Sequence, residues 1–284
     1  MRSRRTERNP QLIIKPKPFY RYAAAIAYDG SVYHGWQRQG DPQVATVQAD
    51  VERALSFVAA STITVSCAGR TDTGVHGTGQ VIHFDSPVQR PEKAWVMGAN
   101  TQLPATVRVL WAVPVDDQFH ARFSATARRY RYVIDNSPVA PAILAGGLTH
   151  VRIPLDAELM HRAAQRLLGE QDFSAFRGAG CQSNTPFRHV HHVRVVRRDH
   201  LVVIDIKANA FLLHMVRNIA GSLIEVGAGR KPADWIDDLL LARDRRLAAA
   251  TAAPNGLYLI DVEYPDYPSL PSLPLGPFFT AFLN

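Results

Sequence analysis

One glycine-rich segment holds a carboxylate and an arginine two positions apart. Asp72 and Arg70 stand in the stretch 67–80, which contains four glycines and lies between two β-branched runs, 62–65 and 81–84. Because glycines tolerate positive φ angles and the close approach of a ligand, this loop can present one side chain at the edge of a cleft. Asp72 is therefore a candidate for catalysis. The alternative is a structural turn in which Asp72 only caps its own backbone.

A second segment, residues 119–132, combines arginines with aromatic side chains. From residue 122 onward it has four arginines and three aromatic residues within eleven positions. Guanidinium groups bind phosphates and aromatic faces stack on unpaired bases, so this mixture is typical of a surface for single-stranded or loop RNA. The candidate RNA-binding residues at its start are Phe119, His120, Ala121, Arg122 and Phe123.

The end of this segment predicts a strand with two different faces. In a strand, Tyr130 and Tyr132 share one face while Arg129 and Arg131 share the other, so only one pair can face a cleft. The alternative is a half-buried strand whose tyrosines lie in the core and whose arginines lie in solvent.

A third candidate, Arg217, lies in the apolar stretch 211–226. The apolar spacing predicts one long helix, with Arg217 at the border of its apolar face and His214 on the opposite, polar face. An arginine at such a border can lay its stem on apolar surface and reach a carboxylate in a neighbouring cleft. The alternative is that Arg217 points into water.

Composition and charge narrow the class of protein. The chain has 284 residues, 46% of them hydrophobic, and no apolar run near the roughly 20 residues that span a bilayer, so we expect no membrane contact and a place in the cytosol. The net charge is +7, of which the first eighteen residues carry +5, so local clusters of charge say more than the total. Cys67 and Cys181 are too few for a disulfide framework or a thiolate metal site, and the eleven histidines form no metal-binding motif.

The order of predicted elements repeats. The first half reads β-α-β-β-α-β, and the second half reads the same with one extra strand and one extra helix. We therefore predict an α+β fold of two ferredoxin-like domains, with mainly antiparallel sheets and a cleft where the sheets meet. The predicted strands are 20–28, 62–66, 80–85, 107–113, 130–134, 149–153, 190–196, 201–206 and 257–262, and the predicted helices are 46–58, 91–100, 156–168, 211–226 and 233–242. The predicted divisions are a disordered basic leader (1–18), an N-terminal domain with the glycine-rich loop (19–118), a C-terminal domain (119–264) and a Pro-rich tail (265–284).

The motifs together resemble one known family. The residues 69–76 read Gly-Arg-Thr-Asp-Thr-Gly-Val-His, which closely resembles the motif of the tRNA pseudouridine synthase A family. The resemblance continues at 121–125, 131–132, 172–176, 209–218 and 253–259 and covers residues 19 to 264. Two departures are Thr73, where family members often carry alanine, and a longer basic leader.

The resemblance implies a fold and an activity. Family members isomerise uridine to pseudouridine at positions thirty-eight to forty of the tRNA anticodon stem-loop, without a cofactor or a required metal. Their fold is two ferredoxin-like domains that form one continuous sheet with a central cleft, and they are homodimers that share a tRNA.

The resemblance also implies residue roles. Asp72 would be the nucleophile, Arg217 would pair with it and orient it, and Arg70 would assist base flipping. Tyr130 would stack on the target uracil and could help with proton transfer. Two other functions stay open: a non-catalytic RNA-binding protein that uses residues 122–132 as its platform, and a nucleoside hydrolase centred on Asp72, for which a second carboxylate is not evident.

Overall fold

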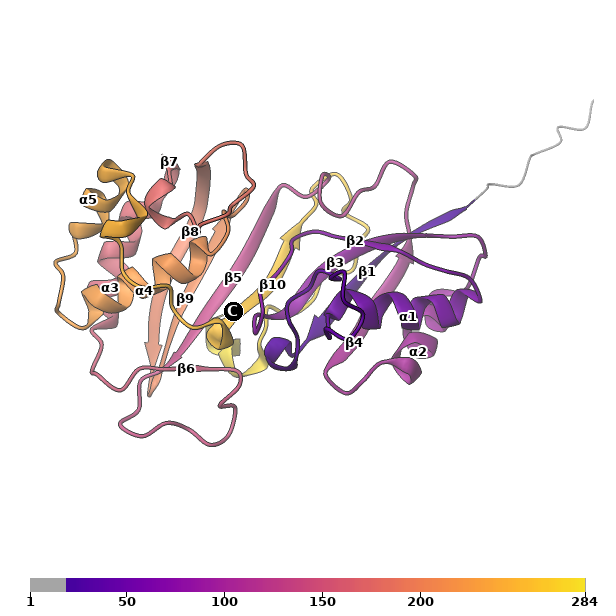
Figure 1. The fold of residues 1–284 in the computed structure, drawn as a ribbon, viewed down its shortest axis with the longest axis horizontal. Coiled ribbons are helices and arrows are strands. Elements are labelled where there is room, and N and C mark those ends of the chain that lie inside the picture. The colour runs from indigo at the N-terminus through magenta and orange to yellow at the C-terminus, as the bar shows by residue number, and fades with distance from the viewer. Residues whose placement is uncertain (1–18, 284) are drawn as a thin grey trace, which may run out of the picture.

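The computed structural model describes residues 19–283 and shows one continuous sheet of ten strands with helices packed along it (Figure 1). The strand order is β4-β1-β3-β10-β5-β9-β8-β7, with β2 paired to β3 and β6 paired to β5. All pairings are antiparallel except β10 with β3 and β5 with β6. The predicted α+β class with mainly antiparallel strands is confirmed. The predicted leader, residues 1–18, lies outside the described residues.

The elements of the first half lie close to their predicted positions. The first helix begins one residue after its predicted start, with Thr46 at the N-cap position and no capping hydrogen bond from its side chain. The elements are β1 (Tyr20–Tyr28), α1 (Val47–Ala59), β2 (Val65–Cys67), β3 (His76–Ser86), α2 (Glu92–Gln102) and β4 (Val107–Pro114). Figure 1 shows α1 and α2 beside the strands of this half.

The second half contains the remaining elements. Asp156, at the predicted start of the helix, caps α3 by accepting a hydrogen bond from the Leu159 backbone amide. The strands are β5 (Ala127–Asp135), β6 (Thr149–His150), β7 (Gly169–Asp172), β8 (Phe187–Arg198), β9 (Leu201–Ala208) and β10 (Leu257–Glu263), and the helices are α3 (Ala157–Ala164), α4 (Met215–Gly227) and α5 (Trp235–Ala242).

The two halves meet where β10 joins β3. Tyr258 pairs with His76 and Leu259 pairs with Gly77 in parallel register. A Cβ atom at Gly79 would lie 2.2 Å from the Ile260 carbonyl oxygen, so only glycine permits this approach. The expectation of two sheets that meet at a cleft is therefore corrected to one continuous sheet, as the resemblance implied. The pairing of His76 and Gly77 with β10 explains why β3 begins at His76 and not at residue 80.

Two hydrophobic clusters fill the helix-covered parts of the sheet. One consists of residues between Tyr22 and Ala112, with α1 and α2 in it. The other gathers mostly residues from Phe119 to Tyr264, with α3 and α4 in it. Each half of the sheet therefore carries a core of its own.

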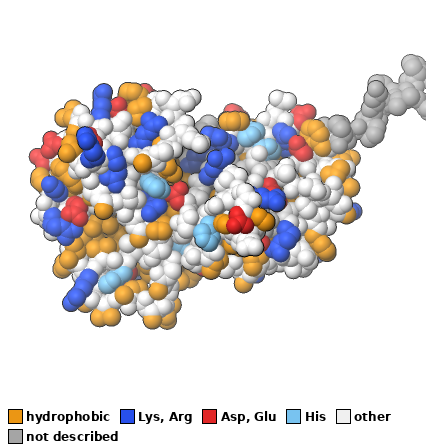
Figure 2. All heavy atoms as spheres, in the orientation of Figure 1, with side chains coloured by type: hydrophobic (Ala, Val, Ile, Leu, Met, Phe, Trp, Pro, Cys, Tyr) orange, Lys and Arg blue, Asp and Glu red, His pale blue; other side chains and the backbone are white. Residues whose placement is uncertain are grey.

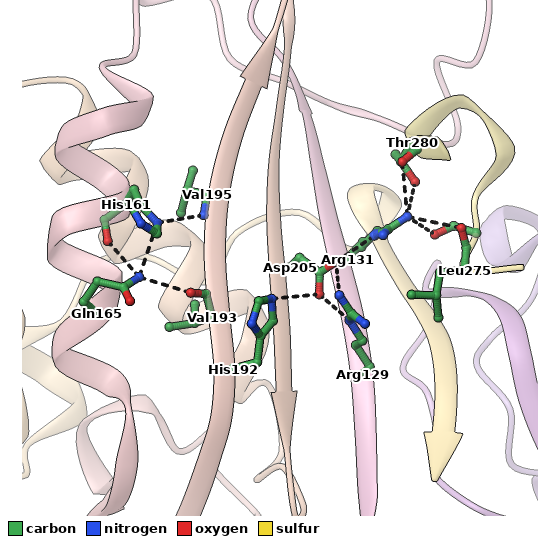
Figure 3. Close-up of polar contacts among 11 residues, drawn as sticks. Arg129, Arg131, His161, Gln165, His192, Val193, Val195, Asp205, Leu275 and Thr280 are labelled. Atoms are coloured by element: carbon green, nitrogen blue, oxygen red, sulfur yellow. Dashed lines mark hydrogen bonds and ion pairs between the residues drawn. The ribbon is translucent and has the colours of Figure 1, made fainter. Parts of the chain in front are cut away.

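The Pro-rich tail covers the opposite face of the second half. Leu275, Phe279 and Phe282 pack against a small cluster that includes Val133 and Val203. The guanidinium of Arg131, which is fully buried, donates to the backbone carbonyl oxygens of Leu275 and Thr280 (Figure 3). The tail thus lies against β5 from the side that faces away from the helices.

Within residues 19–283, no helix is long and apolar enough to cross a membrane.

Candidate active site

The turn that carries Asp72 is held from several sides. Its backbone closes through the Val75 amide, which donates to the Asp72 carbonyl oxygen at 3.1 Å. The Thr71 carbonyl oxygen accepts from the Trp36 amide at 3.0 Å, and the Thr71 hydroxyl lies 2.8 Å from the Tyr28 hydroxyl. These hydrogen bonds fix the backbone of the glycine-rich segment at Asp72. The Asp72 side chain, which is 30% exposed, therefore extends into the cleft from a fixed backbone position.

A glycine in another loop makes this packing possible. Gly35 has a φ of +90°, and a Cβ atom there would lie 2.9 Å from the Thr71 carbonyl oxygen. A side chain at position 35 would therefore push the turn away.

Asp72 is paired with Arg217, as predicted. The Arg217 Nη1 atom lies 3.5 Å from Asp72 Oδ2, and its Nε atom donates to the Ala252 carbonyl oxygen at 2.8 Å. The Arg217 side chain is only 14% exposed, so the alternative in which it points into water is wrong. Helix α4 of the second half thus reaches the carboxylate of the first half.

A second partner of Asp72 was missed by the sequence analysis. The Nε2 atom of His214 lies 3.4 Å from Asp72 Oδ2. The predicted helix 211–226 placed His214 on the polar face, but α4 begins at Met215 and His214 precedes it with a φ of +59°. This backbone conformation turns the imidazole toward the cleft. The one signal in the sequence is its spacing of three residues from Arg217, which lets both approach one ligand.

Tyr130, on β5, lines the same cleft as the Asp72 carboxylate. Its ring packs edge-on against Phe211, with 5.1 Å between ring centres, and its side chain is 8% exposed. Burial raises the pKa of the Tyr130 hydroxyl far above its usual value, and the charge of Asp72 raises it further against the opposing effect of Arg128. Tyr130 therefore keeps its proton at neutral pH. Among residues 19–283 its hydroxyl has no hydrogen-bond partner, which leaves it available to a ligand.

The question of which face of β5 meets the cleft is settled. Tyr130 faces the cleft, whereas Arg129 and Arg131 bind the buried Asp205 carboxylate on the opposite face, at 2.6 and 2.9 Å (Figure 3). Tyr132 is fully buried, and its hydroxyl donates to the Ala253 carbonyl oxygen. The alternative with the arginines in solvent is wrong for Arg131, which is fully buried.

The side chains of Asp72, Tyr130, His214 and Arg217 line a cleft of about 940 Å³ at the junction of the two halves. In the described part of the chain, Asp72 is the single acidic residue among its lining side chains, which include five arginines. Figure 2 shows Lys and Arg side chains gathered near the middle of the displayed face, where the halves meet. The cleft arginines are Arg70, Arg122, Arg128, Arg188 and Arg217. Such a concentration of positive charge attracts a polyanion.

The predicted RNA-binding residues divide into two groups. Arg70, Arg122 and Phe123 are exposed at the cleft, and Phe123 is 76% exposed. His120 is half-buried and packs on Phe123, with 4.3 Å between ring centres. In contrast, the side chains of Phe119 and Ala121 are fully buried in the core, and the structure does not present them to a ligand. The segment 119–123 therefore contributes some residues to the core and others to the surface.

Two cysteine thiols, Cys67 and Cys181, also line the cleft. Burial raises the pKa of the Cys67 thiol to about 11. Because the thiolate is the reactive form of cysteine, Cys67 is a poor nucleophile at neutral pH. Asp72 is therefore a stronger candidate than Cys67, and the Cys181 sulfur already accepts a hydrogen bond from the Leu213 backbone amide at 3.4 Å. No group of three or more His, Cys, Asp or Glu side chains that could hold a metal ion occurs in the same described residues.

Comparison with known proteins identifies the family. The family model described as tRNA pseudouridine synthase matches residues 24–124 and 163–265. The proteins called tRNA pseudouridine synthase A of Escherichia fergusonii and of Escherichia coli strain SMS-3-5 are each 59% identical over 264 residues, which cover 93% of this chain and 97% of theirs. A chain in a solved structure of a Cbf5-Nop10-Gar1 complex is similar at a TM-score of 0.31 and 10% identity, over 84% of this chain and 57% of that one, which is too low to carry an argument. With matches of this extent and identity, the chain belongs to the tRNA pseudouridine synthase family.

Proposed function

We propose that this protein isomerises uridine to pseudouridine in tRNA with Asp72 as the nucleophile. The observation that carries the proposal is the position of Asp72, the one carboxylate lining the described cleft, 3.5 Å from Arg217. A nearby positive charge favours the ionised form of a carboxylate, which is the nucleophilic form. The surrounding arginines suit an RNA backbone.

The reaction is an isomerisation and consumes no other reactant. The bond between N1 of uracil and C1′ of ribose breaks, a bond between C5 and C1′ forms, and the proton on C5 is lost while N1 gains one. The base must first leave the RNA stack, at a cost of a few kcal/mol. In this proposal the exposed Arg70 side chain fills the space that the flipped base leaves in the RNA stack. The Tyr130 ring stacks on the uracil and holds it while it rotates.

We further propose the anticodon stem-loop, at positions thirty-eight to forty, as the substrate region and a homodimer as the acting form, in the cytosol. The motif at residues 69–76 and the resemblance across residues 19 to 264 support this. The two-domain, ferredoxin-like description, divided near residue 118, is proposed as well. Each half pairs its strands in the same order, β4-β1-β3-β2 in the first and β10-β5-β9-β8 in the second, which supports it.

The test is a map of pseudouridine in tRNA. Unmodified tRNA is incubated with the protein or with Asp72→Asn, treated with a carbodiimide that leaves stable adducts on pseudouridine, and copied by a primer-extension reaction that stops at each adduct. We expect new stops in the anticodon arm with the native protein and a rate loss on the order of 10⁴-fold or more in the variant. We expect the variant to bind tRNA with unchanged affinity. A protein that binds tRNA and produces no stops would instead be an RNA-binding protein without this chemistry, and released uracil would indicate a hydrolase.

A further inference from the structure

We propose that His214 is a positioning residue that fixes the Asp72 carboxylate, so that its Oδ2 atom is occupied and its Oδ1 atom faces the uridine. This inference rests on the proposed function of Asp72. His214 is 34% exposed and lines the same cleft.

The contacts of the carboxylate are one-sided. His214 Nε2 lies 3.4 Å and Arg217 Nη1 lies 3.5 Å from the same oxygen, Oδ2. Within residues 19–283, no hydrogen bond or ion pair reaches Oδ1. Two donors that approach one oxygen, His214 just before α4 and Arg217 in its first turn, restrict rotation of the carboxylate, whereas one donor leaves it free to turn. The oxygen without a partner is therefore the one presented to a substrate.

The donor role of His214 follows from its partner. An ionised carboxylate can only accept hydrogen bonds, so the Nε2 atom that faces it carries the proton. Distances of this kind are commonly long before a substrate binds and shorten in the complex.

The backbone of His214 is held in a conformation that non-glycine residues rarely adopt. Its φ of +59° and ψ of 5° lie in the left-handed region, which costs free energy and persists only where the surroundings impose it. The Leu213 carbonyl oxygen accepts from the Gly178 amide at 2.8 Å, and the Leu213 amide donates to Cys181 Sγ at 3.4 Å. Residues 178–181 thus hold the peptide just before His214 through hydrogen bonds and orient the His214 side chain.

Gly178 is the closest support of the imidazole. A Cβ atom at position 178 would lie 2.9 Å from the Leu213 carbonyl oxygen and 3.0 Å from His214 Nδ1. Gly178→Ala would therefore displace His214 without altering the chemical groups of His214 or Asp72. Gly180, in the same loop, has a φ of +78° and no atom within 4 Å of a Cβ at its position. Gly180→Ala is the matched control, since it strains the loop without touching His214.

The experiment measures single-turnover pseudouridine formation and tRNA affinity in four variants. His214→Gly removes the imidazole and suits the positive φ, so it should fold. We expect it to lose on the order of 10- to 100-fold in rate with unchanged tRNA affinity, because one charge-assisted contact to the carboxylate is lost. Added free imidazole should restore much of the rate, and His214→Gln, which keeps a donor of similar reach, should retain more rate than His214→Gly. Gly178→Ala should lose rate as His214→Gly does, and Gly180→Ala should stay close to the native protein.

Three results would overturn the inference. The first is a native rate in His214→Gly. The second is a loss of rate that neither imidazole nor His214→Gln relieves, because such a loss reflects structure and not a donor. The third is a native protein that produces no pseudouridine, which overturns the proposed function as well; the first two leave the proposed function intact.

Discussion

Arg217 joins the turn that carries Asp72 to the segment that leads into β10. Its Nη1 atom faces Asp72 Oδ2 at 3.5 Å while its Nε atom donates to the Ala252 carbonyl oxygen at 2.8 Å. The Ala252 amide in turn donates to the Arg217 carbonyl oxygen at 3.2 Å. The guanidinium is therefore fixed at one end by second-half backbone and presents its other end to a carboxylate from the first half. The site exists only where the two halves of the sheet are joined.

Arg217→Lys should lower the rate of pseudouridine formation although it keeps the charge. An ammonium group can reach Asp72 or the Ala252 carbonyl oxygen, but it lacks the planar fork that reaches both. A hydrogen bond to a charged group contributes about 1.5–3 kcal/mol, so we expect a loss of about 10- to 100-fold in kcat. Single-turnover rates at saturating tRNA measure this. Arg230→Lys is the control, because Arg230 forms an exposed ion pair with Glu225 just beyond α4, and it should leave the rate unchanged. Native kcat in Arg217→Lys would show that charge alone suffices.

Tyr130→Phe separates stacking from the hydroxyl. The hydroxyl has no hydrogen-bond partner among the described residues, so its removal should leave Tm unchanged. Stacking should remain, so KM should stay within about twofold, whereas kcat should fall if measured where chemistry limits the rate. Tyr130→Leu removes the aromatic face as well and should weaken capture of the base by about 1–3 kcal/mol.

Tyr132→Phe provides the contrast two residues along the same strand. The Tyr132 hydroxyl lies 2.8 Å from the Thr149 hydroxyl and donates to the Ala253 carbonyl oxygen. Its loss should lower the free energy of unfolding by about 1 kcal/mol and leave kcat close to native. Unchanged turnover in Tyr130→Phe would restrict Tyr130 to stacking.

Local patterns in the sequence predicted most of the secondary structure, whereas the pairing of Asp72 with Arg217, which lie 145 positions apart, was implied by the family resemblance. Alternation placed Tyr130 and Arg131 on opposite faces of β5, and helical spacing found α1, where apolar residues recur along one face. These features depend on residues near each other in the chain, so one sequence suffices to find them.

Contacts between distant segments were the ones that local patterns could not predict. The start of β3 at His76 depends on the pairing of His76 and Gly77 with β10, and α4 begins only at Met215, after a peptide that the Gly178 amide holds by a hydrogen bond to the Leu213 carbonyl oxygen. The short strand β7 (Gly169–Asp172) is entirely polar apart from its glycine and exists through pairing with β8. In each case a tertiary contact overrides the local preference of the residues.

Arg122→Ala should weaken tRNA binding in a salt-dependent way. Arg122 is exposed at the cleft, and an arginine that neutralises one phosphate contributes about 1 to the slope of log affinity against log salt. We expect weaker binding at 50 mM salt and a slope reduced by about 1, measured by fluorescence anisotropy with labelled tRNA. Arg53→Ala is the control, because Arg53 is exposed on α1 and paired with Asp50. A slope equal to that of the native protein would exclude Arg122 from the RNA contact.

Acid should loosen the segment that carries Arg122, through His83. The His83 Nδ1 atom accepts a hydrogen bond from the Ala121 amide at 3.1 Å, and its ring lies 4.4 Å from that of His120. Burial, together with the charges of His120 and Arg21, lowers the pKa of His83 to about 4. The unfolded chain therefore binds a proton at this position between about pH 6.5 and 4 that the folded protein does not, so stability falls as the pH falls through this window.

His83→Asn tests this linkage, because asparagine keeps an acceptor near the Nδ1 position but does not titrate in this range. We expect the native protein to lose about 2 kcal/mol more stability than His83→Asn between pH 7.5 and 5, which corresponds to about 3 to 4 °C in Tm for a chain of this length. Thermal unfolding followed by circular dichroism at both pH values measures the difference. Histidines that do not contact His83 contribute equally to both proteins and cancel in the comparison. Equal losses of Tm in the two proteins would mean that His83 does not couple the Ala121 segment to pH.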